Sequence, residues 1–392
     1  MAKNSFEPQS CFEHIDKLSY EIGPRLASTE GSQQASEYIK QQFESYGLEA
    51  RFHNFDFVDK ITQIKSRVII LIGVLLGAFF LNLYLGSLVS LLFVSGGYGV
   101  AYFIPYLLPK KEEKNVVGIL KPETDIEKRI ILGAHYDSAR CTKGRKWTLF
   151  FRIAFPMILV AFLAFSICGI FLGMTGWIIG WSVLGAPYLF VCTLPFWFYE
   201  DLVSPGANDN ASGVSIVLEV ARVLSESPLD NTEIRFIAFG AEEEGLKGSK
   251  DFSERTAAPD FFLNLDSLGS GDKLSVIQGN GVIRKRKTDQ LLNKKMMEKS
   301  DLDIVWAPFS GHDHISFLKK NMKATTLSSI EYQEKNKLDL FLEKFFSLSN
   351  AHIFRHSYLH SLEDVPEKIS LENIKKSGSI VLDLFAIEED KT

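Results

Sequence analysis

The sequence predicts an α/β fold, a three-layer sandwich around a mostly parallel mixed sheet, with two inserted transmembrane helical hairpins. Three observations lead to this prediction. Short β-rich runs alternate with helical segments, as in sheets that helices cover on both faces. Two long blocks, Val68–Pro109 and Ile153–Tyr199, contain no charged residue. Polar residues of the kinds that bind metal ions follow several of the apolar runs.

The elements of the polar sequence are bounded by turn residues. Gly23-Pro24 ends the first predicted helix and Gly47 ends the second, because glycine and proline favour helix ends. Helices are predicted over Ser10–Glu21, Ser32–Tyr46, Val214–Leu224, Leu246–Arg255, Arg284–Lys299 and Leu371–Glu388. Strands are predicted over Leu48–Val58, Asn115–Leu120, Arg129–Ala134, Glu233–Phe239, Phe261–Leu265, Leu274–Ile277 and Ala324–Leu327.

The two charge-free blocks predict four membrane spans. They contain about 42 and about 47 residues, each about twice the ~20 residues that a spanning helix needs. A buried helix pair is the alternative, but long helices of soluble proteins normally show a polar face. Lysine and arginine flank both blocks, so the positive-inside rule predicts an integral, multi-pass membrane protein whose soluble domain faces the cytoplasm.

Both predicted hairpins interrupt a single domain. Residues 1–65, 110–148 and 200–392 are predicted to form this domain, with the hairpins at 66–109 and 149–199. The partners that this organisation predicts are the lipid bilayer and the substrate of the domain.

Composition excludes two other classes of protein. The net charge is −5 with acidic and basic residues well mixed, and no basic face or RNA-binding motif is present, which argues against a nucleic-acid partner. The four cysteines show no CxxC spacing, so a disulfide framework is not expected. The polar N-terminus, Met1–Glu13, has no apolar segment typical of a cleavable signal peptide.

Metal-binding residue types follow three of the predicted strands. His135 follows the strand Arg129–Ala134, a run of three glutamates begins at Glu242, and Asp266 follows Phe261–Leu265. The carboxyl ends of strands in open α/β sheets meet at one edge, where binding sites form. Asp209, in the loop that precedes a predicted helix, can reach the same edge. No cationic residue within these motifs balances the acids, so they predict a pair of divalent metal ions.

Each of these residues also has an ordinary structural explanation. A histidine at a strand end is often a hydrogen-bonding residue, three glutamates are usually a solvated turn, and Asp209 is a good helix N-cap. Their joint occurrence at equivalent ends of the strands favours the metal site.

The set of motifs resembles the co-catalytic di-zinc exopeptidases of metallopeptidase family twenty-eight, which includes zinc aminopeptidases and has glutaminyl cyclases as relatives. Gly23-Pro-Arg25, followed by a helix, also resembles the opening of that family. The resemblance covers nearly all of the polar sequence but not the two hairpins. The matching motifs are Ala134-His-Tyr-Asp-Ser138, Gly206-Ala-Asn-Asp-Asn-Ala-Ser-Gly213, Ala241-Glu-Glu-Glu-Gly-Leu-Lys-Gly-Ser249, Asn264-Leu-Asp266 and His360-Ser-Leu-Glu-Asp364.

The resemblance implies two Zn2+ per chain, held by five side chains. His135 and Asp266 would bind one zinc ion. Glu243 and His360 would bind the other, and Asp209 would bridge the two.

The resemblance also implies two residues that assist the reaction. Glu242 would be the general base that takes a proton from a metal-activated water and returns it to the leaving amine. Asp137 would orient the His135 ring through its far nitrogen, as carboxylates beside metal ligands do.

Other histidines near these motifs are expected to have lesser roles. Asp313 and His314 are expected to line the pocket or to support the ligands, and His312 is expected to be a solvated loop residue.

The assignments near the C-terminus are less constrained by the motifs. His352 and His356 could compete with His360 for the ligand role, but only His360 is followed by Asp364 at the spacing of the family. Tyr332 is one candidate for the residue that stabilises the oxyanion.

The implied activity is that of a membrane-anchored zinc exopeptidase, most simply an aminopeptidase that acts on a peptide substrate. Two alternatives stay open: a glutaminyl-cyclase-like acyltransferase, which uses one zinc ion in a related site, and a non-catalytic membrane protein on the same fold.

Overall fold

The chain divides into two units. The computed structural model describes residues 5–85, 103–142, 199–331, 337–348 and 358–389, with scattered residues between these ranges. The first unit contains Met1–Phe55, Glu112–Arg140 and Leu202–Thr392. The second contains Asp56–Lys111 and Cys141–Asp201. All of the predicted site residues belong to the first unit.

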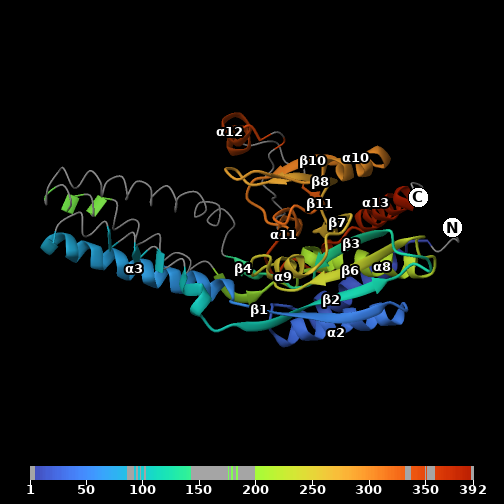
Figure 1. Cartoon of the computed structure of the whole chain (residues 1–392), viewed down its shortest axis with the longest axis horizontal. Helices are drawn as coiled ribbons and strands as arrows, with labels where there is room; N and C mark the ends of the chain where they lie inside the picture. Colours follow the sequence, from blue (N-terminus) through green and yellow to red (C-terminus); the bar gives the residue numbers. More distant parts are fainter. Residues whose placement is uncertain are drawn as a thin grey trace. The chain divides into compact units, whose positions relative to one another are not determined.

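A nine-stranded mixed sheet forms the centre of the first unit (Figure 1). The strand order is β1-β2-β6-β3-β7-β11-β8-β10, and β9 pairs with β8. The strands are β1 (Glu49–Phe57), β2 (Lys111–Leu120), β3 (Lys128–His135), β6 (Thr232–Phe239), β7 (Phe261–Asp266), β8 (Lys273–Asn280), β9 (Arg286–Lys287), β10 (Asp303–Ala307) and β11 (Ala324–Ile330). Two short strands, β4 (Arg140–Thr142) and β5 (Tyr199–Val203), form a separate ladder.

The four central strands β6, β3, β7 and β11 are parallel, whereas β2 and β8 run antiparallel to their neighbours β6 and β11. The predicted mostly parallel centre is therefore confirmed. The register pairs His135 with Phe239 and Asp266 with Ser328. Because of this register, the carboxyl ends of the four strands lie at one edge of the sheet.

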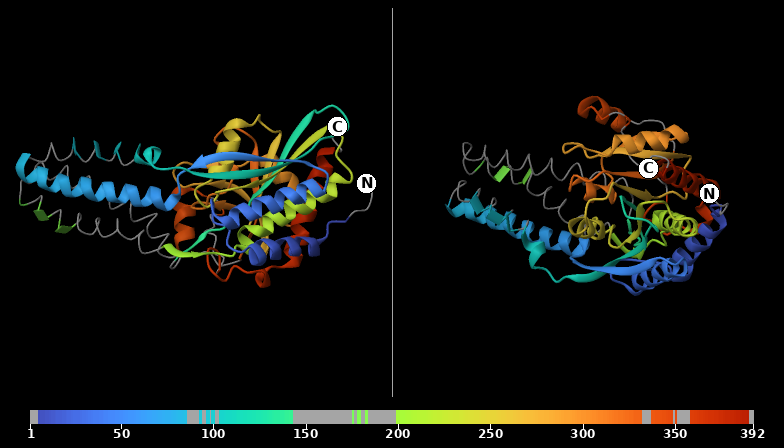
Figure 2. Two further views of the ribbon diagram at one scale, coloured as in Figure 1. Left: turned by 90° about the horizontal axis from the view of Figure 1, so that it is seen from below. Right: turned by 45° about the vertical axis from the view of Figure 1, so that its right-hand side comes forward.

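Helices cover both faces of the sheet because apolar side chains alternate along the strands. On β3, Ile130 and Leu132 pack into the larger core, and Ile131 packs into a second core with Phe252 and Phe317. The larger core contains residues of α1 (Pro8–Asp16), α2 (Glu30–Ser45), α8 (Ser212–Ser225), α10 (Gln290–Lys299) and α13 (Leu371–Glu389). The second core contains residues of α9 (Lys247–Arg255) and α11 (His314–Leu318). Figure 2 shows these elements from two further directions.

Several elements differ from the sequence-based prediction. The helix predicted from Arg284 begins only at Gln290, because the Asp289 side chain accepts a hydrogen bond from the Leu292 N–H at 2.9 Å and caps it. The preceding residues Arg286–Lys287 pair with β8 instead. The strand β10, the helix α11 and the helix α12 (Lys337–Phe346) were not predicted.

The predicted transmembrane hairpins are contradicted by the structure. In the part of the chain that is described, no helix combines the length and the apolar character needed to cross a bilayer. Residues 66–109 contribute to the helix α3 (Lys60–Leu85), which starts with the polar turns Lys60–Arg67, and to a short turn, Ile104–Leu107. The prediction was wrong because it equated a charge-free run with continuous spanning helices.

The second predicted hairpin, residues 149–199, lies almost entirely outside the described residues. Three further predictions depended on both hairpins: the four-span topology, the bilayer as a partner and the orientation toward the cytoplasm. None of the three is supported.

His14 makes the stability of the fold depend on pH. This side chain of α1 is buried, with Nδ1 2.6 Å from the Tyr38 hydroxyl and Nε2 3.2 Å from the Tyr46 hydroxyl. Burial lowers the pKa of His14 to about 4, although the charge of Glu219 opposes the shift. In the unfolded chain the imidazole titrates near pH ~6.5.

The unfolded chain therefore binds a proton between pH 6.5 and 4 that the folded chain does not. We expect the free energy of unfolding to fall as the pH is lowered through this window, by roughly 3 kcal/mol at most from this residue. Urea unfolding of metal-free wild type and His14→Asn at several pH values measures the effect. The difference between the two proteins should change across the window, and a difference that stays constant would contradict the assignment.

Candidate metal centre

The five predicted metal-binding residues come from separate segments that meet at the carboxyl edge of the central strands. His135 ends β3 and Asp266 ends β7, the neighbouring strand of the sheet (Figure 1). Glu243 lies in the loop between β6 and α9, and Asp209 lies in the turn Ala207–Ala211 before α8. His360 lies in a turn before α13.

These residues form two groups of three that share Asp209. One group is His135, Asp209 and Asp266, and the other is Asp209, Glu243 and His360; in each, one potential ligand atom per residue lies within 4.8 Å of the others. His135 Nε2 is 3.1 Å from Asp209 Oδ1 and 3.9 Å from Asp266 Oδ1. His360 Nε2 is 3.1 Å from Asp209 Oδ2 and 3.0 Å from Glu243 Oε1. The two oxygens of Asp209 thus face two different imidazoles.

The neighbouring carboxylates raise the pKa of both histidines. Burial by itself would lower the pKa of His135, but Asp137, Asp209 and Glu242 outweigh it and raise that pKa well above its ordinary value. Burial likewise opposes the effect of Glu243 and Asp209, which raise the pKa of His360 to about 10. The pKa of Asp209 is lowered far below its ordinary range by the two histidines, although burial acts in the other direction.

The donor set fits zinc. Histidine nitrogen and carboxylate oxygen are ligand types that zinc prefers, and zinc binds the neutral imidazole. A divalent cation among these donors would take the place of the protons on the two histidines. Divalent cations there would also offset the negative charge of the three carboxylates, of which Asp209 and Asp266 are buried.

The loop before α8 directs the side chain of Asp209 toward the two histidines, whereas the asparagines on either side of it contact the end of β7 and the segment that follows it. Gly206 has a φ of +63°, a left-handed conformation that favours glycine. Asn208 Oδ1 accepts hydrogen bonds from the Gly269 and Ser270 N–H groups at 2.8 and 3.0 Å. Asn210 donates from Nδ2 to the Leu265 carbonyl at 2.9 Å, and its Oδ1 accepts from the Ser267 N–H at 3.1 Å. The two asparagines bind the loop to the end of β7, and Asp209 between them faces the histidines.

Asp364 supports the same loop from the C-terminal side. Its two carboxylate oxygens accept hydrogen bonds from the backbone N–H groups of Asn208, at 2.7 Å, and of Asp209, at 3.1 Å. Asp364 is fully buried. Burial raises the pKa of Asp364 to about 6, as does the charge of Asp209, although the two backbone hydrogen bonds lower it. The sequence motif contained Asp364, but its contact with the Asp209 loop could not be read from spacing.

Asp137 holds the glutamate loop in the same manner. Its two oxygens accept from the N–H groups of Glu242, at 3.0 Å, and Glu243, at 3.1 Å. His135 Nδ1 lies 3.1 Å from the Asp137 carbonyl oxygen and 3.6 Å from Asp137 Oδ1. Asp137 thus contacts the far nitrogen of His135 and also fixes the backbone of the next predicted ligand.

His312 was wrongly expected to be solvated. It is buried, and its Nδ1 lies 2.6 Å from Asp266 Oδ2. The polar sequence Ser-Gly-His-Asp-His is typical of an exposed loop, so it does not predict this contact. Strand β7 and the loop before α11 are distant in the sequence and come together only in the folded chain. His312 therefore contacts Asp266 Oδ2, whereas His135 lies nearer to Oδ1.

Asp313 and His314 are also fully buried. Burial raises the pKa of Asp313 to about 7, and Asp266 and Asp137 add to the shift. His314 contacts Thr326 Oγ1 through Nδ1 and Asn280 Oδ1 through Nε2, both at 2.5 Å. His314 thus fixes the start of α11, which carries the loop of His312. His352, His356 and Tyr332 lie outside the described residues.

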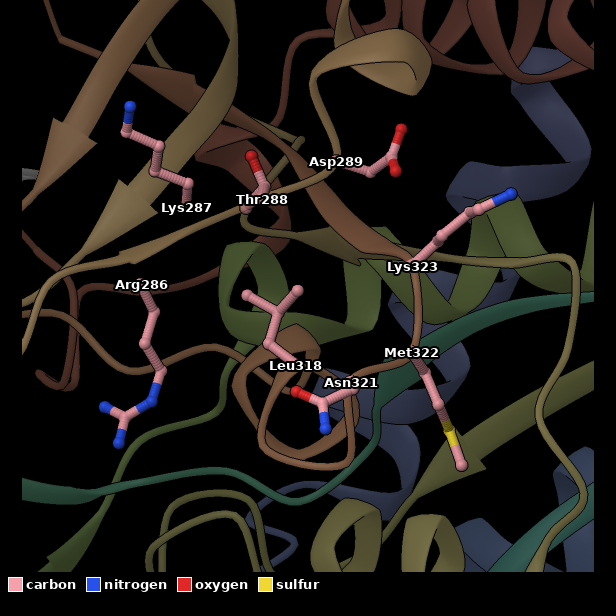
Figure 3. A pocket seen from close by; sticks show the side chains of 8 residues that line it. All are labelled: Arg286, Lys287, Thr288, Asp289, Leu318, Asn321, Met322 and Lys323. Carbon is pink, nitrogen blue, oxygen red and sulfur yellow. The ribbon is translucent and has the colours of Figure 1, made fainter.

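A separate cavity of about 420 Å3 lies near the start of α10 and the segment that follows α11. Figure 3 shows Arg286, Lys287 and Lys323 on different sides of it. None of the five predicted ligands lines this cavity. Its basic lining does not suit a divalent cation, so it is not the metal centre.

Comparison with known sequences finds similar peptidases. Residues 192–385 match the model of peptidase family M28. The chain is 31% identical over 185 residues to aminopeptidase YwaD of Bacillus subtilis, an alignment that covers 45% of this chain and 36% of YwaD. It is 27% identical over 129 residues to aminopeptidase Y of Saccharomyces cerevisiae, which covers 31% of this chain and 24% of that protein. The aligned part thus spans about a third or less of these relatives.

Solved structures with the same fold include two kinds of enzyme. The zinc aminopeptidase BSAP from Bacillus subtilis superposes with a TM-score of 0.59 at 17% identity, covering 98% of this chain and 96% of that one. A glutaminyl cyclase from Bacteroides thetaiotaomicron gives a TM-score of 0.56 at 14% identity, covering 98% of each chain. At 17% and 14% identity, these similarities show a shared fold. Residues 192–385 are thus similar to peptidase family M28, and the chain shares the fold of the zinc aminopeptidase BSAP.

Proposed function

We propose that this chain is a zinc-dependent aminopeptidase that cleaves the N-terminal residue from a peptide. The observation that carries the proposal is the pair of ligand groups that share Asp209. The aminopeptidases among its sequence relatives support it, although they align over only part of their length. The peptidase domain would comprise residues 1–65, 110–148 and 200–392.

The geometry supports two zinc ions per chain. His135 and Asp266 would hold one ion, and Glu243 and His360 the other, with one oxygen of Asp209 directed toward each. When bound, zinc supplies Lewis-acid chemistry, which lowers the pKa of a water molecule toward neutrality and stabilises negative charge on a carbonyl oxygen.

Glu242 would move the proton during the reaction. Its backbone N–H donates to Asp137 Oδ1 at 3.0 Å, and the N–H of the adjacent proposed ligand Glu243 donates to Oδ2 at 3.1 Å. Burial raises the pKa of Glu242 well above its ordinary value, and the neighbouring carboxylates add to the shift while His135 opposes it. A carboxylate of raised pKa can accept a proton from the attacking water at Oε and then donate it to the leaving amine.

A second candidate is an acyltransferase of the glutaminyl-cyclase kind. The observation that favours it is the similar TM-score to a glutaminyl cyclase, 0.56, compared with 0.59 for the aminopeptidase. Fold likeness at such low identity does not separate the two reactions. The third possibility, a non-catalytic protein, requires that neither hydrolysis nor cyclisation is detected when zinc is bound.

The first prediction concerns Glu242. Glu242→Gln should retain zinc but lose about 10²- to 10⁴-fold in kcat, because the amide cannot accept the proton. Glu254→Gln is the matched control, since it makes the same change at an exposed side chain outside the metal centre and should stay close to wild type. Turnover of aminoacyl-coumarin substrates and zinc content by elemental analysis are measured together. Wild-type kcat in Glu242→Gln would remove this residue from its role.

The second prediction concerns the metal content. Dialysed wild type should contain two zinc ions per chain, and either His135→Ala or His360→Ala should lower that number, because each changes a different group of ligands. Treatment with a chelator should abolish peptide hydrolysis, and added zinc should restore it. One zinc ion in the wild type, together with cyclisation of N-terminal glutamine, would favour the acyltransferase instead.

The third prediction tests how Asp364 supports the Asp209 loop. Asp364→Asn leaves one oxygen to accept two N–H groups, so the loop loses a hydrogen bond. We expect zinc affinity to fall about 10- to 100-fold, the usual effect of removing a partner that orients metal ligands. Competition with a chelating dye measures it, and exposed Glu363→Gln serves as the control. Equal affinities in Asp364→Asn and the wild type would show that the loop holds its shape without this carboxylate.

A further inference from the structure

Arg25 is a fully buried arginine in the first unit, with none of its side chain exposed. It lies in the segment between the first helix and α2, far from the predicted ligands in sequence and before the start of the family match at residue 192. No step of the proposed reaction involves Arg25. A buried guanidinium is nevertheless costly unless its donors are satisfied.

The guanidinium of Arg25 is within hydrogen-bond distance of five backbone carbonyl oxygens, three of which share the two N–H groups of Nη1. Nε donates to Tyr136 at 2.8 Å, and Tyr136 lies between His135 and Asp137. Nη1 donates to Pro205 and Nη2 to Gly206, both at 2.8 Å, at the start of the Asp209 loop. The other two bonds go to Leu18 and Gly23, the preceding part of the same N-terminal segment. One side chain thus bridges the end of β3 and the Asp209 loop.

The backbone of Arg25 strengthens the same connection. Its N–H donates to Ser138 Oγ at 2.9 Å, and the Ser138 N–H donates to the Arg25 carbonyl at 3.2 Å. At Gly206 a Cβ atom would lie 2.9 Å from Arg25 Nη2 and 2.8 Å from Ser138 Cβ. Any residue larger than glycine at position 206 would therefore clash with Arg25 or Ser138 unless the loop moved away.

The charge of Arg25 is placed among carboxylates without contacting one. Among the described residues, no carboxylate lies within 4.0 Å of the guanidinium, the limit for an ion pair. Burial lowers the pKa of Arg25 to about 10, and Asp364, Asp137 and Asp209 oppose this shift, so the side chain stays cationic at neutral pH. These three acids support or form the predicted metal centre, and the positive charge reduces their mutual repulsion at longer range.

Lysine cannot reproduce this arrangement. Its ammonium has three donors at one point, whereas the guanidinium presents five donors in a fixed planar fork. The carbonyls of Tyr136, Pro205 and Gly206 are reached by different edges of that fork. The geometry therefore requires arginine, and charge alone does not suffice.

We propose that Arg25 is a positioning residue of the metal centre, because its guanidinium fixes the His135–Asp137 strand end relative to the Asp209 loop. The N-terminal segment is then part of the centre, although it carries no ligand. The inference rests on the proposed zinc site. A purely structural arginine would affect folding stability alone, whereas a positioning residue also sets the zinc affinity of the folded protein.

The experiment compares Arg25→Lys and Arg25→Met with the control Arg222→Lys. Arg222 also donates several hydrogen bonds, to Glu219, Glu226 and the Ser5 carbonyl, but it contacts none of the predicted ligands. Ser138→Ala is a milder change to the same connection, and it keeps the test decisive if the arginine variants do not fold. Folding is checked by circular dichroism and by urea unfolding of the metal-free proteins.

The readouts are the zinc dissociation constant, from competition with a chelating dye, and the visible spectrum of the cobalt-substituted protein, which reports ligand geometry. We expect zinc binding to weaken at least ~10-fold in Arg25→Lys and Arg25→Met and by a smaller factor in Ser138→Ala, with altered cobalt spectra. Arg222→Lys should stay within about twofold of the wild type, because distant sites act independently.

Folded Arg25→Lys or Ser138→Ala with wild-type zinc affinity and an unchanged cobalt spectrum would overturn the inference. Peptide hydrolysis is not needed for these readouts. A wild-type protein that binds zinc but hydrolyses no peptide would refute the proposed function and leave the Arg25 comparison intact. A wild-type protein that binds no zinc would refute both.

Discussion

The carboxylate of Asp209 is the group on which the arrangement of the site depends. It is buried, and its two oxygens face the imidazoles of His135 and His360, each at 3.1 Å. A buried carboxylate is unfavourable unless cations and hydrogen bonds compensate for lost water. Here Asp266 and Glu243 add further negative charge beside the same histidines. Metal ions between these donors would compensate the negative charge of the buried carboxylates. Zinc matches the ligand types, which are histidine nitrogen and carboxylate oxygen.

The surrounding structure holds backbone segments in place more than it contacts the ligands themselves. Asp137 and Asp364 each use both carboxylate oxygens to accept two successive backbone N–H groups, one pair in the glutamate loop and one in the Asp209 loop. Arg25 makes the complementary contact, because its donors hold carbonyl oxygens of two other segments. These three residues order loops that lie far apart in the sequence. Support of this kind is needed because a metal site tolerates little displacement of its ligands.

The sequence predicted which candidate ligands come together better than it predicted the structure of the two charge-free blocks. The elements that carry the site follow strong periodic patterns, so the strands that end at His135 and Asp266 were predicted within a few residues of their observed bounds. His312 and Asp364 were misjudged or left without a role, because their partners come from remote segments that no local pattern connects. The prediction of the membrane topology was wrong for another reason. It rested on the absence of charged residues, which is a property of composition and does not determine where helices begin or end.

The proposal places two metal ions on opposite oxygens of one carboxylate. Crystals of the zinc-loaded chain, with diffraction recorded on both sides of the zinc absorption edge, would locate the metal without reference to activity. The account predicts two anomalous peaks flanking Asp209, one beside His135 and Asp266 and the other beside Glu243 and His360. A single peak, or peaks on other residues with Asp209 uncoordinated, would contradict it.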